Sequence, residues 1–261
     1  MKQIDKKSKK RLIIILASFS LGVFLTGRYI VGQANRPEDT AEADEVKTTV
    51  VKKVKKKSEK KELTNVQMDV PLESQFSGYA LNNGCEVTAL SMLLNYYGYQ
   101  TTKNSLAKLM YYVPVIVENG YRGNPHDGFV GDITGGELAM GADVEPVSNV
   151  AKQVVGDDFK VVQSQETSMD DLIKVLNKKT PIWVKVTQEF TMPNDYSFMY
   201  WNTTSGQVKV TPLNHAVVIT GYDKNNIYVN DPYGYKDRAV PKDDFEYIFD
   251  AMGRQSIYLS E

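Results

Sequence analysis

Hydrophobic residues recur at helical spacing in the segment that begins at Cys85. Apolar side chains three or four positions apart predict one buried helical face, formed by Val87, Leu90, Leu93, Leu94 and Tyr97. Gly98 is a suitable residue to end this helix. Residues 82–84, which precede the helix, are typical of a turn. The same kind of spacing predicts further helices at residues 105–112, 144–155, 172–177 and 242–249.

Shorter apolar runs predict strands, and most of them lie in the second half of the chain. The clearest run is 216–220, which is followed by a turn at 221–226 and an antiparallel partner at 227–230. Other strands are predicted at 66–70, 159–162, 181–186 and 256–259. Two long segments, 119–141 and 190–210, are predicted to be irregular. A loop as long as 119–141 in a compact domain is typically functional. Helices that precede most of the sheet predict an α+β domain.

The N-terminal 34 residues have the pattern of a signal peptide or a membrane anchor. Six basic side chains and one acidic side chain occur in residues 1–11, and residues 12–25 are almost wholly apolar. Two interpretations stay open: a signal peptide cleaved near Ala34, or an uncleaved anchor whose apolar stretch extends to Val31. Both place the N-terminus in the cytoplasm, since positive charge precedes the apolar stretch. We expect an exported protein with a single N-terminal membrane anchor and an extracellular folded domain.

Residues 35–65 contain no aromatic side chain and little periodic apolar pattern. Acidic residues are frequent in the first part of this segment and lysines in the second, which is typical of a flexible tether. The sequence therefore predicts a basic N-terminus with an anchor or signal peptide (1–34), a charged flexible linker (35–65) and one folded domain (66–261).

The composition limits the chemistry of the folded domain. A net charge of −1 provides no overall field that would attract nucleic acid. One cysteine cannot form an internal disulfide, and two histidines with one cysteine do not give a zinc-ligand pattern. We therefore expect no metal, no cofactor and no nucleic-acid partner, and we expect a monomer.

Cys85 lies at the start of the first predicted helix. Unpaired N–H groups and the positive end of the helix dipole lower the pKa of a thiol at this position, which favours a nucleophile. A buried apolar role is the alternative, because free cysteine is among the most buried residue types. A candidate base is His215, at the mouth of the strand 216–220. The predicted hairpin returns to Asp231, and a simple antiparallel register places this carboxylate beside His215.

Four motifs stand out along the folded domain. They are residues 81–98 (LNNGCEVTALSMLLNYYG), 124–131 (NPHDGFVG), 213–223 (LNHAVVITGYD) and 229–234 (VNDPYG). Together they resemble the nucleophile, middle, histidine and aspartate motifs of the C39-like peptidases, which are bacterial and mostly exported proteins. The resemblance covers roughly residues 66–259. It implies a papain-like cysteine peptidase fold, in which a helical N-terminal part with the nucleophile helix packs on an antiparallel sheet.

The resemblance also implies the role of each catalytic residue. It assigns Cys85 as the nucleophile, His215 as the general base and then the acid, and Asp231 as the residue that orients the imidazole. It further implies that the middle and histidine motifs contribute to the substrate cleft. The residues expected to line this cleft are Phe129, Val130, Gly131 and Asn214.

The oxyanion donor is the point at which this sequence departs from the family pattern. Family members commonly carry a glutamine six residues before the cysteine, but Tyr79 occupies that position here. Gln75 lies ten residues before Cys85 and fits only if residues 76–81 bulge outward. Asn83 is the other candidate, and the backbone N–H of Cys85 would be the second donor.

These observations predict an exported, thiol-dependent peptidase or amidase that hydrolyses an amide bond through a Cys-His-Asp triad. Its expected partner is a peptide or cell-wall peptide substrate, with the membrane contacted through the N-terminal segment. The alternative is a catalytically impaired papain-like module that binds peptide or cell-wall ligands. A cleft filled by Tyr79 or Phe76 favours the binding module, whereas a side-chain amide near the oxyanion position favours the enzyme.

Overall fold

The computed structural model of the chain describes residues 64–136 and 139–261. The predicted anchor or signal peptide (1–34) lies outside these ranges, as does almost all of the predicted linker (35–65). Within the ranges described, no helix has the length and apolar character needed to cross a membrane. The described residues belong to one compact unit.

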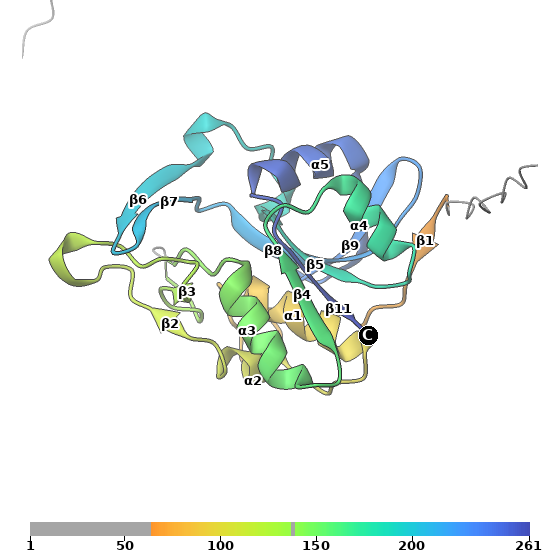
Figure 1. The fold of residues 1–261 in the computed structure, drawn as a ribbon, viewed down its shortest axis with the longest axis horizontal. Coiled ribbons are helices and arrows are strands. Elements are labelled where there is room, and N and C mark those ends of the chain that lie inside the picture. Colours follow the sequence, from red (N-terminus) through yellow and green to blue (C-terminus); the bar gives the residue numbers. More distant parts are fainter. Residues whose placement is uncertain (1–63, 137–138) are drawn as a thin grey trace, which may run out of the picture. The chain divides into compact units, whose positions relative to one another are not determined.

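A seven-stranded sheet forms the centre of the described domain (Figure 1). Six strands follow one another across the sheet: β10 (Tyr235–Pro241), β9 (Asn226–Asp231), β8 (Asn214–Tyr222), β5 (Ile182–Thr187), β11 (Ser256–Ser260) and β4 (Lys160–Ser164). The seventh strand, β1 (Val66–Gln67), pairs with the end of β8. All of these pairs are antiparallel.

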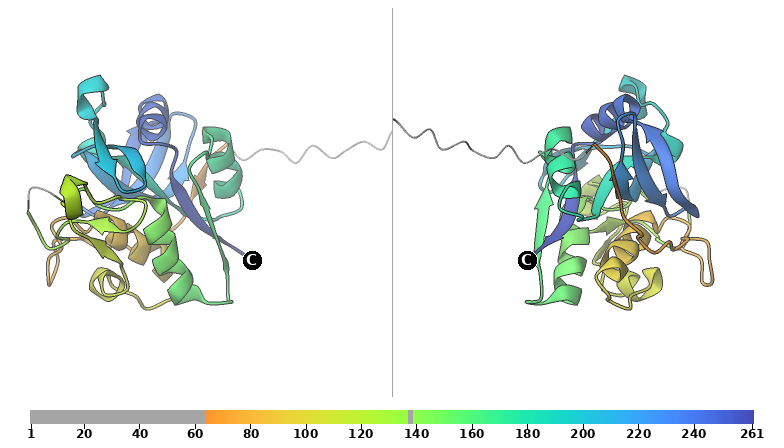
Figure 2. Two further views of the ribbon diagram at one scale, coloured as in Figure 1. Left: turned by 60° about the vertical axis from the view of Figure 1, so that its left-hand side comes forward. Right: turned by 90° about the vertical axis from the view of Figure 1, so that its right-hand side faces the viewer.

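In the described residues, five α-helices cover the sheet. They are α1 (Cys85–Tyr96), α2 (Lys103–Ala107), α3 (Val144–Val155), α4 (Met169–Leu176) and α5 (Lys242–Ala251). The views in Figures 1 and 2 show α1, α2 and α3 on one side of the sheet and α4 and α5 on the other. The expected α+β class is therefore confirmed.

Helix α1 packs against the middle of the sheet. Its first ten residues, Cys85 to Leu94, are all buried, so the helix has no broad solvent-exposed face there. The indole N–H of Trp183 on β5 donates a hydrogen bond to the backbone oxygen of Glu86, with a distance of 3.1 Å. Apolar burial stabilises a fold by roughly 25 cal/mol per Å2, so the packing of α1 on the sheet is a main source of stability. The helix that carries the only cysteine is thus held firmly in place.

The smaller elements lie around this core. They are the parallel pair β2 (Tyr112–Val113) and β3 (Phe129–Val130), the hairpin β6 (Met199–Thr203) and β7 (Gly206–Val210), and the 3-10 helices η1 (Glu118–Gly120), η2 (Gln188–Phe190) and η3 (Asp195–Ser197). The prediction that 190–210 is irregular was wrong, and strand β10 was not predicted. Both segments keep most of their side chains at least partly exposed, so they lack the strong apolar alternation that identifies a strand.

Helix α2 is shorter and begins earlier than predicted. Thr102 accepts a hydrogen bond from the Ser105 backbone N–H, and the Ser105 side chain occupies the reciprocal position of a capping box. This cap sets the start of the helix at Lys103 rather than at Ser105. The predicted extent of α3, residues 144–155, agrees with the structure.

Candidate active site

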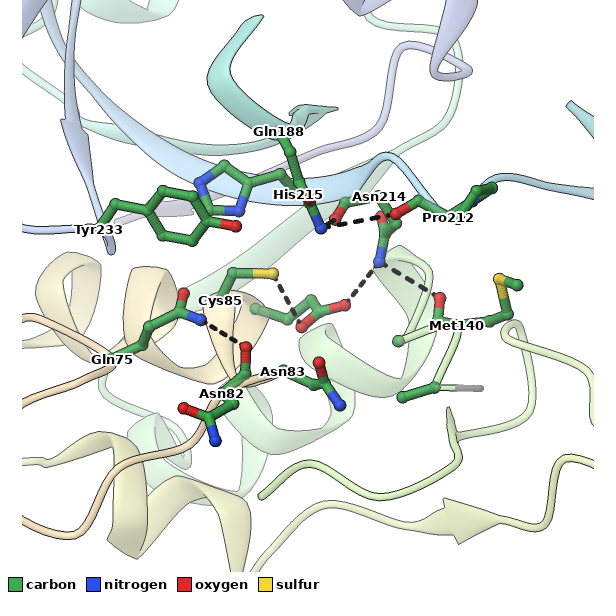
Figure 3. A pocket seen from close by; sticks show the side chains of 13 residues that line it. Gln75, Asn82, Asn83, Cys85, Met140, Gln188, Pro212, Asn214, His215 and Tyr233 are labelled. Carbon is green, nitrogen blue, oxygen red and sulfur yellow. Dashed lines mark hydrogen bonds between the residues drawn. The ribbon is translucent and has the colours of Figure 1, made fainter. Parts of the chain in front are cut away.

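A small pocket of about 40 Å3 lies where the first turn of α1 meets the start of β8 (Figure 3). Cys85 from α1 and His215 from β8 both line it, together with Tyr233 from the turn after β9. The complete lining consists of Gln75, Asn82, Asn83, Cys85, Glu86, Ala139, Met140, Gly141, Gln188, Pro212, Asn214, His215 and Tyr233.

The turn before α1 places Cys85 at the first helical position. The N–H of Gly84 donates to the oxygen of Leu81 at 2.9 Å, and both the N–H and the hydroxyl of Thr88 donate to the oxygen of Gly84. A Cβ atom at Gly84 would lie 2.5 Å from Cβ of Leu81, so a larger residue does not fit this turn. At the first position of a helix the backbone N–H of Cys85 has no acceptor within the helix, and it is available to a ligand.

His215 and Asp231 come together through the β8–β9 pairing. The register pairs Val218 with Asn230, and its continuation by one residue would place Asp231 opposite Val217. His215 is then the diagonal neighbour of Asp231 on the same face of the sheet. The imidazole Nε2 lies 2.8 Å from Asp231 Oδ1, and both side chains are almost fully buried. A proton on Nε2 directed at Asp231 leaves Nδ1 as the ring atom that can exchange a proton with another group.

Three groups hold the Asp231 carboxylate. Besides His215, the backbone N–H of Tyr233 donates to Oδ1 at 3.0 Å, and Nη1 of Arg238 donates to Oδ2 at 3.1 Å. Burial alone would raise the pKa of Asp231, but the hydrogen bond and charge of His215, the Tyr233 N–H and the Arg238 charge outweigh it and lower this pKa. Arg238 is also bonded to Glu189 Oε2 at 2.9 Å. Asp231 is therefore an ionised residue with a fixed orientation.

Arg238 and Tyr233 were not predicted from the sequence. Arg238 lies on β10, a strand with no clear apolar pattern, so nothing in the sequence indicated its contact with Asp231. The ring of Tyr233 lies 4.6 Å from the ring of His215 and covers it on one side. Burial is the main cause that raises the pKa of Tyr233 to about 12, and the nearby carboxylates of Asp231 and Glu189 act in the same direction. Tyr233 is therefore a neutral cover for the imidazole.

The thiol of Cys85 does not have the environment expected from its helix position. Its Sγ donates to Oε2 of Glu86 at 3.2 Å, and the residue is buried. Burial, followed by the charge and hydrogen bond of Glu86, raises the pKa of the Cys85 thiol well above its ordinary value. The expectation of a lowered pKa was wrong for this arrangement, because loss of solvent and an adjacent carboxylate outweigh the helix dipole.

Gln75 reaches the pocket because residues 76–80 form an outward loop. The N–H of Leu81 donates to the oxygen of Gln75 at 2.9 Å, which closes the loop at its base. Phe76 and Tyr79 are 49% and 72% exposed and do not line the pocket, whereas Gln75 is only 1% exposed. The N–H of Gln75 also donates to the oxygen of Pro232 at 2.8 Å, so this residue is tied to the turn that follows Asp231. The bulge that Gln75 required is present.

Gln75 and Asn83, the two candidate oxyanion donors, differ in whether their side-chain amide has an N–H that is not already bonded. The Nδ2 atom of Asn83 donates to the oxygens of Asp132 and Gly136, at 2.8 and 3.2 Å, which uses both of its hydrogens. Within the part of the chain that the structure describes, the Nε2 atom of Gln75 donates only to the oxygen of Asn82, at 2.9 Å (Figure 3). A primary amide has two N–H donors. Gln75 therefore keeps one for a ligand, and Asn83 does not.

The cleft predicted from the middle motif needs correction. Asn214 lines the pocket, but Phe129 and Val130 are fully buried and do not. Gly131 lines a separate open hollow, next to Tyr112. Strand β3 is enclosed by neighbouring segments, and the pocket wall is formed instead by residues 139–141, which pair with β3 through Val130. His126 of the same motif bonds Asp143 and Glu145 at 3.2 and 3.1 Å, outside this pocket.

Comparison with known proteins identifies relatives of the chain. The family model of the Peptidase_C39 like family matches residues 67–257. The uncharacterised protein YvpB of Bacillus subtilis (strain 168) is 40% identical over 194 residues, covering 74% of this chain and 76% of YvpB. A Bacillus anthracis protein, described from its crystal structure as a putative C39-like peptidase, is 32% identical with a TM-score of 0.70, covering 76% of this chain and 98% of that one. The chain therefore belongs to the Peptidase_C39 like family.

Proposed function

We propose that this protein is a thiol-dependent peptidase or amidase with a papain-like catalytic centre. One observation carries the proposal: His215, which is bonded to the buried Asp231 at 2.8 Å, lines the same small pocket as the only cysteine of the chain. A cysteine at a helix start, facing an imidazole oriented by a carboxylate, is the arrangement used for nucleophilic attack on carbonyl groups. Cys85 is the nucleophile, His215 the base and then the acid, and Asp231 the orienting residue.

The reaction follows from these positions. His215 takes the proton from the thiol, and the sulfur attacks the carbonyl carbon of the amide bond. The backbone N–H of Cys85 and the free N–H of Gln75 stabilise the oxyanion of the tetrahedral intermediate. The imidazolium then gives its proton to the leaving amine, and a water molecule activated by His215 hydrolyses the acyl-enzyme.

Two further features support a peptide substrate. Oε1 of Gln75 and Oδ1 of Asn214 are buried beside the pocket and have no hydrogen-bond partner among residues 64–136 and 139–261. Buried acceptors in proteins are nearly always bonded, and the amide N–H groups of a peptide would supply the missing donors.

We extend the proposal to an exported enzyme that acts, as a monomer, on peptides or cell-wall peptides, with residues 12–31 as the signal or anchor.

Gln75 gives a prediction that separates the two candidate oxyanion donors. Gln75→Ala should lower kcat about a hundredfold with little change in KM, because this donor acts on the transition state. Asn83→Ala is the matched control, since both hydrogens of its amide are bonded to the loop 132–136. Steady-state kinetics of the two variants provide the measurement. A larger loss of kcat in Asn83→Ala would assign the oxyanion site to Asn83 instead.

The proposed function is tested by selective blocking of the thiol. Because Cys85 is the only cysteine, treatment of the full chain with iodoacetamide modifies one site. We expect hydrolysis of at least one substrate in a screen of peptides and peptidoglycan fragments, and complete loss of it after alkylation. Hydrolysis that survives alkylation contradicts the proposal. Binding of a screened compound without any hydrolysis identifies the protein as the catalytically impaired binding module.

A further inference from the structure

Glu86 is a buried carboxylate directly beside the candidate nucleophile. It is 1% exposed, and three neutral groups donate to it. Oε1 accepts from the backbone N–H of Ala142 at 3.0 Å and from Nδ2 of Asn214 at 2.8 Å, and Oε2 accepts from Sγ of Cys85 at 3.2 Å. A buried carboxylate without a cationic partner has a high cost in free energy. A carboxylate exposed on the first helical turn would not have this cost. The burial of Glu86 therefore indicates a role in the pocket.

One side of Glu86 fixes the wall of the pocket. Asn214, which Glu86 orients, also donates to the oxygen of Met140 at 3.3 Å (Figure 3). A Cβ atom at Gly141 would lie 2.0 Å from Oε1 of Glu86 and 2.3 Å from Nδ2 of Asn214. Gly141 also has a φ of +70°, a conformation that other residues rarely adopt. The backbone of residues 140–142 therefore packs directly on the carboxylate and its partner.

The other side of Glu86 faces the thiol. The titratable groups around Sγ are Glu86 on α1, His215 on β8, Asp231 on β9 and Tyr233 in the turn after β9. Two of these, Glu86 and Asp231, are carboxylates that disfavour a thiolate, and Tyr233 is neutral. His215 is the one base among them. In the structure the thiol donates to Oε2 of Glu86, whose Oε1 already accepts two other hydrogen bonds.

We propose that Glu86 is a positioning residue that anchors the pocket wall at residues 140–142 and holds Cys85 in a protonated resting state. The inference rests on the proposed function, for which it supplies the activation step. In that step the S–H turns from Oε2 of Glu86 to the free nitrogen of His215. The proton then passes from sulfur to the imidazole, which gives a thiolate–imidazolium pair, and Glu86 remains a carboxylate throughout. Substrate binding favours this exchange, because the sulfur must turn away from Glu86 and toward the carbonyl carbon before it can attack.

Glu86→Gln tests the inference, because it replaces the oxygen that faces the thiol with an N–H donor. It keeps the oxygen that accepts from Ala142 and Asn214. The two N–H groups of Ala142 and Asn214 require an oxygen, so the glutamine Oε1 takes the place of the glutamate Oε1. Its Nε2 then faces Sγ as a donor, which stabilises a thiolate. We expect the pH midpoint of alkylation by iodoacetamide to fall by about one unit, and alkylation at pH 7 to be about tenfold faster. Glu118→Gln, an exposed residue outside the pocket, is the control for loss of one charge.

Three results decide the outcome. A midpoint that is unchanged or raised in Glu86→Gln, with thermal unfolding that shows a folded protein, overturns the inference. The wild-type chain provides a second measurement that needs no variant: its alkylation at pH 7 should be slower than that of free N-acetylcysteine, and a faster reaction also overturns the inference. A midpoint that falls supports it.

Alkylation does not depend on turnover, so the two proposals can fail separately. A lowered midpoint in a protein that hydrolyses nothing in the screen leaves Glu86 as the residue that controls the thiol and rejects the enzyme. Cys85-dependent hydrolysis with an unchanged midpoint keeps the enzyme and rejects the role of Glu86.

Discussion

Cys85→Ala is expected to abolish hydrolysis while the protein stays folded. The sulfur is the only atom in the pocket proposed to form a covalent bond to the substrate, and loss of a nucleophile typically lowers kcat about 10⁵- to 10⁶-fold. The change removes one buried atom from a small pocket, so the free energy of unfolding should change by about 1 kcal/mol. Initial rates on the best substrate of the screen, together with thermal unfolding, provide the measurement.

Cys85→Ser is the matched variant for this prediction. Its hydroxyl keeps a donor for Oε2 of Glu86, so the pocket keeps its hydrogen bonds. Its activity should also be very low, because the imidazole that removes a proton from a thiol does so far less readily from a serine hydroxyl. Turnover by Cys85→Ala above about one per cent of the wild-type rate would show that the thiol is not the nucleophile.

Asp231→Asn is expected to lower kcat about 10³- to 10⁴-fold. The asparagine amide can present an N–H to Nε2 of His215, which selects the wrong tautomer and removes the negative charge that stabilises the imidazolium. Asp223→Asn is the matched control, because Asp223 lies at the other end of the same β8–β9 hairpin and bonds the backbone N–H groups of Asn225 and Asn226. A loss of activity in Asp223→Asn as large as that in Asp231→Asn would indicate a general effect on the hairpin.

The same variant has a defined effect on stability as the pH changes. The pKa of Asp231 is lowered in the folded chain from its ordinary value of 3.8. A lowered carboxyl pKa adds stability that is fully present above the ordinary value and is lost as the pH falls through the folded value. The difference in unfolding free energy between wild type and Asp231→Asn should therefore be largest above about pH 5 and shrink toward pH 3. Urea unfolding at several pH values measures it.

The sequence was informative where apolar periodicity was strong. The spacing in α1 and α3 and the apolar run of β8 predicted these elements, and the hairpin to β9 predicted that His215 and Asp231 meet. The hydrogen bond between them depends on backbone pairing, which a short turn between two apolar strands largely determines. The family resemblance is confirmed by the match over residues 67–257.

Contacts between distant segments could not be read from the same patterns. Arg238 reaches Asp231 from a strand whose side chains are mostly exposed, and Gly141 and Ala142 reach Glu86 from 55 and 56 positions further along the chain. Neither contact leaves a periodic signal. The middle motif was assigned to the cleft, yet Phe129 and Val130 pack inside the domain and only position the segment that pairs with them. The raised pKa of the thiol depends on burial, which the helix position alone does not reveal.

The loop between Gln75 and Leu81 has a consequence for how such proteins diverge. Its two ends are joined by the bond from the Leu81 N–H to the Gln75 oxygen. Tyr79 is largely exposed, whereas the half-exposed ring of Phe76 lies 5.4 Å from the ring of Tyr233. Lengthening a closed surface loop costs little, since each doubling of its length adds only about 0.6 kcal/mol. Insertions and deletions at residues 76–80 can therefore accumulate while the amide and the thiol keep their relative positions. A search pattern that demands a constant glutamine-to-cysteine spacing would discard such homologues, whereas a pattern with a variable gap would retain them.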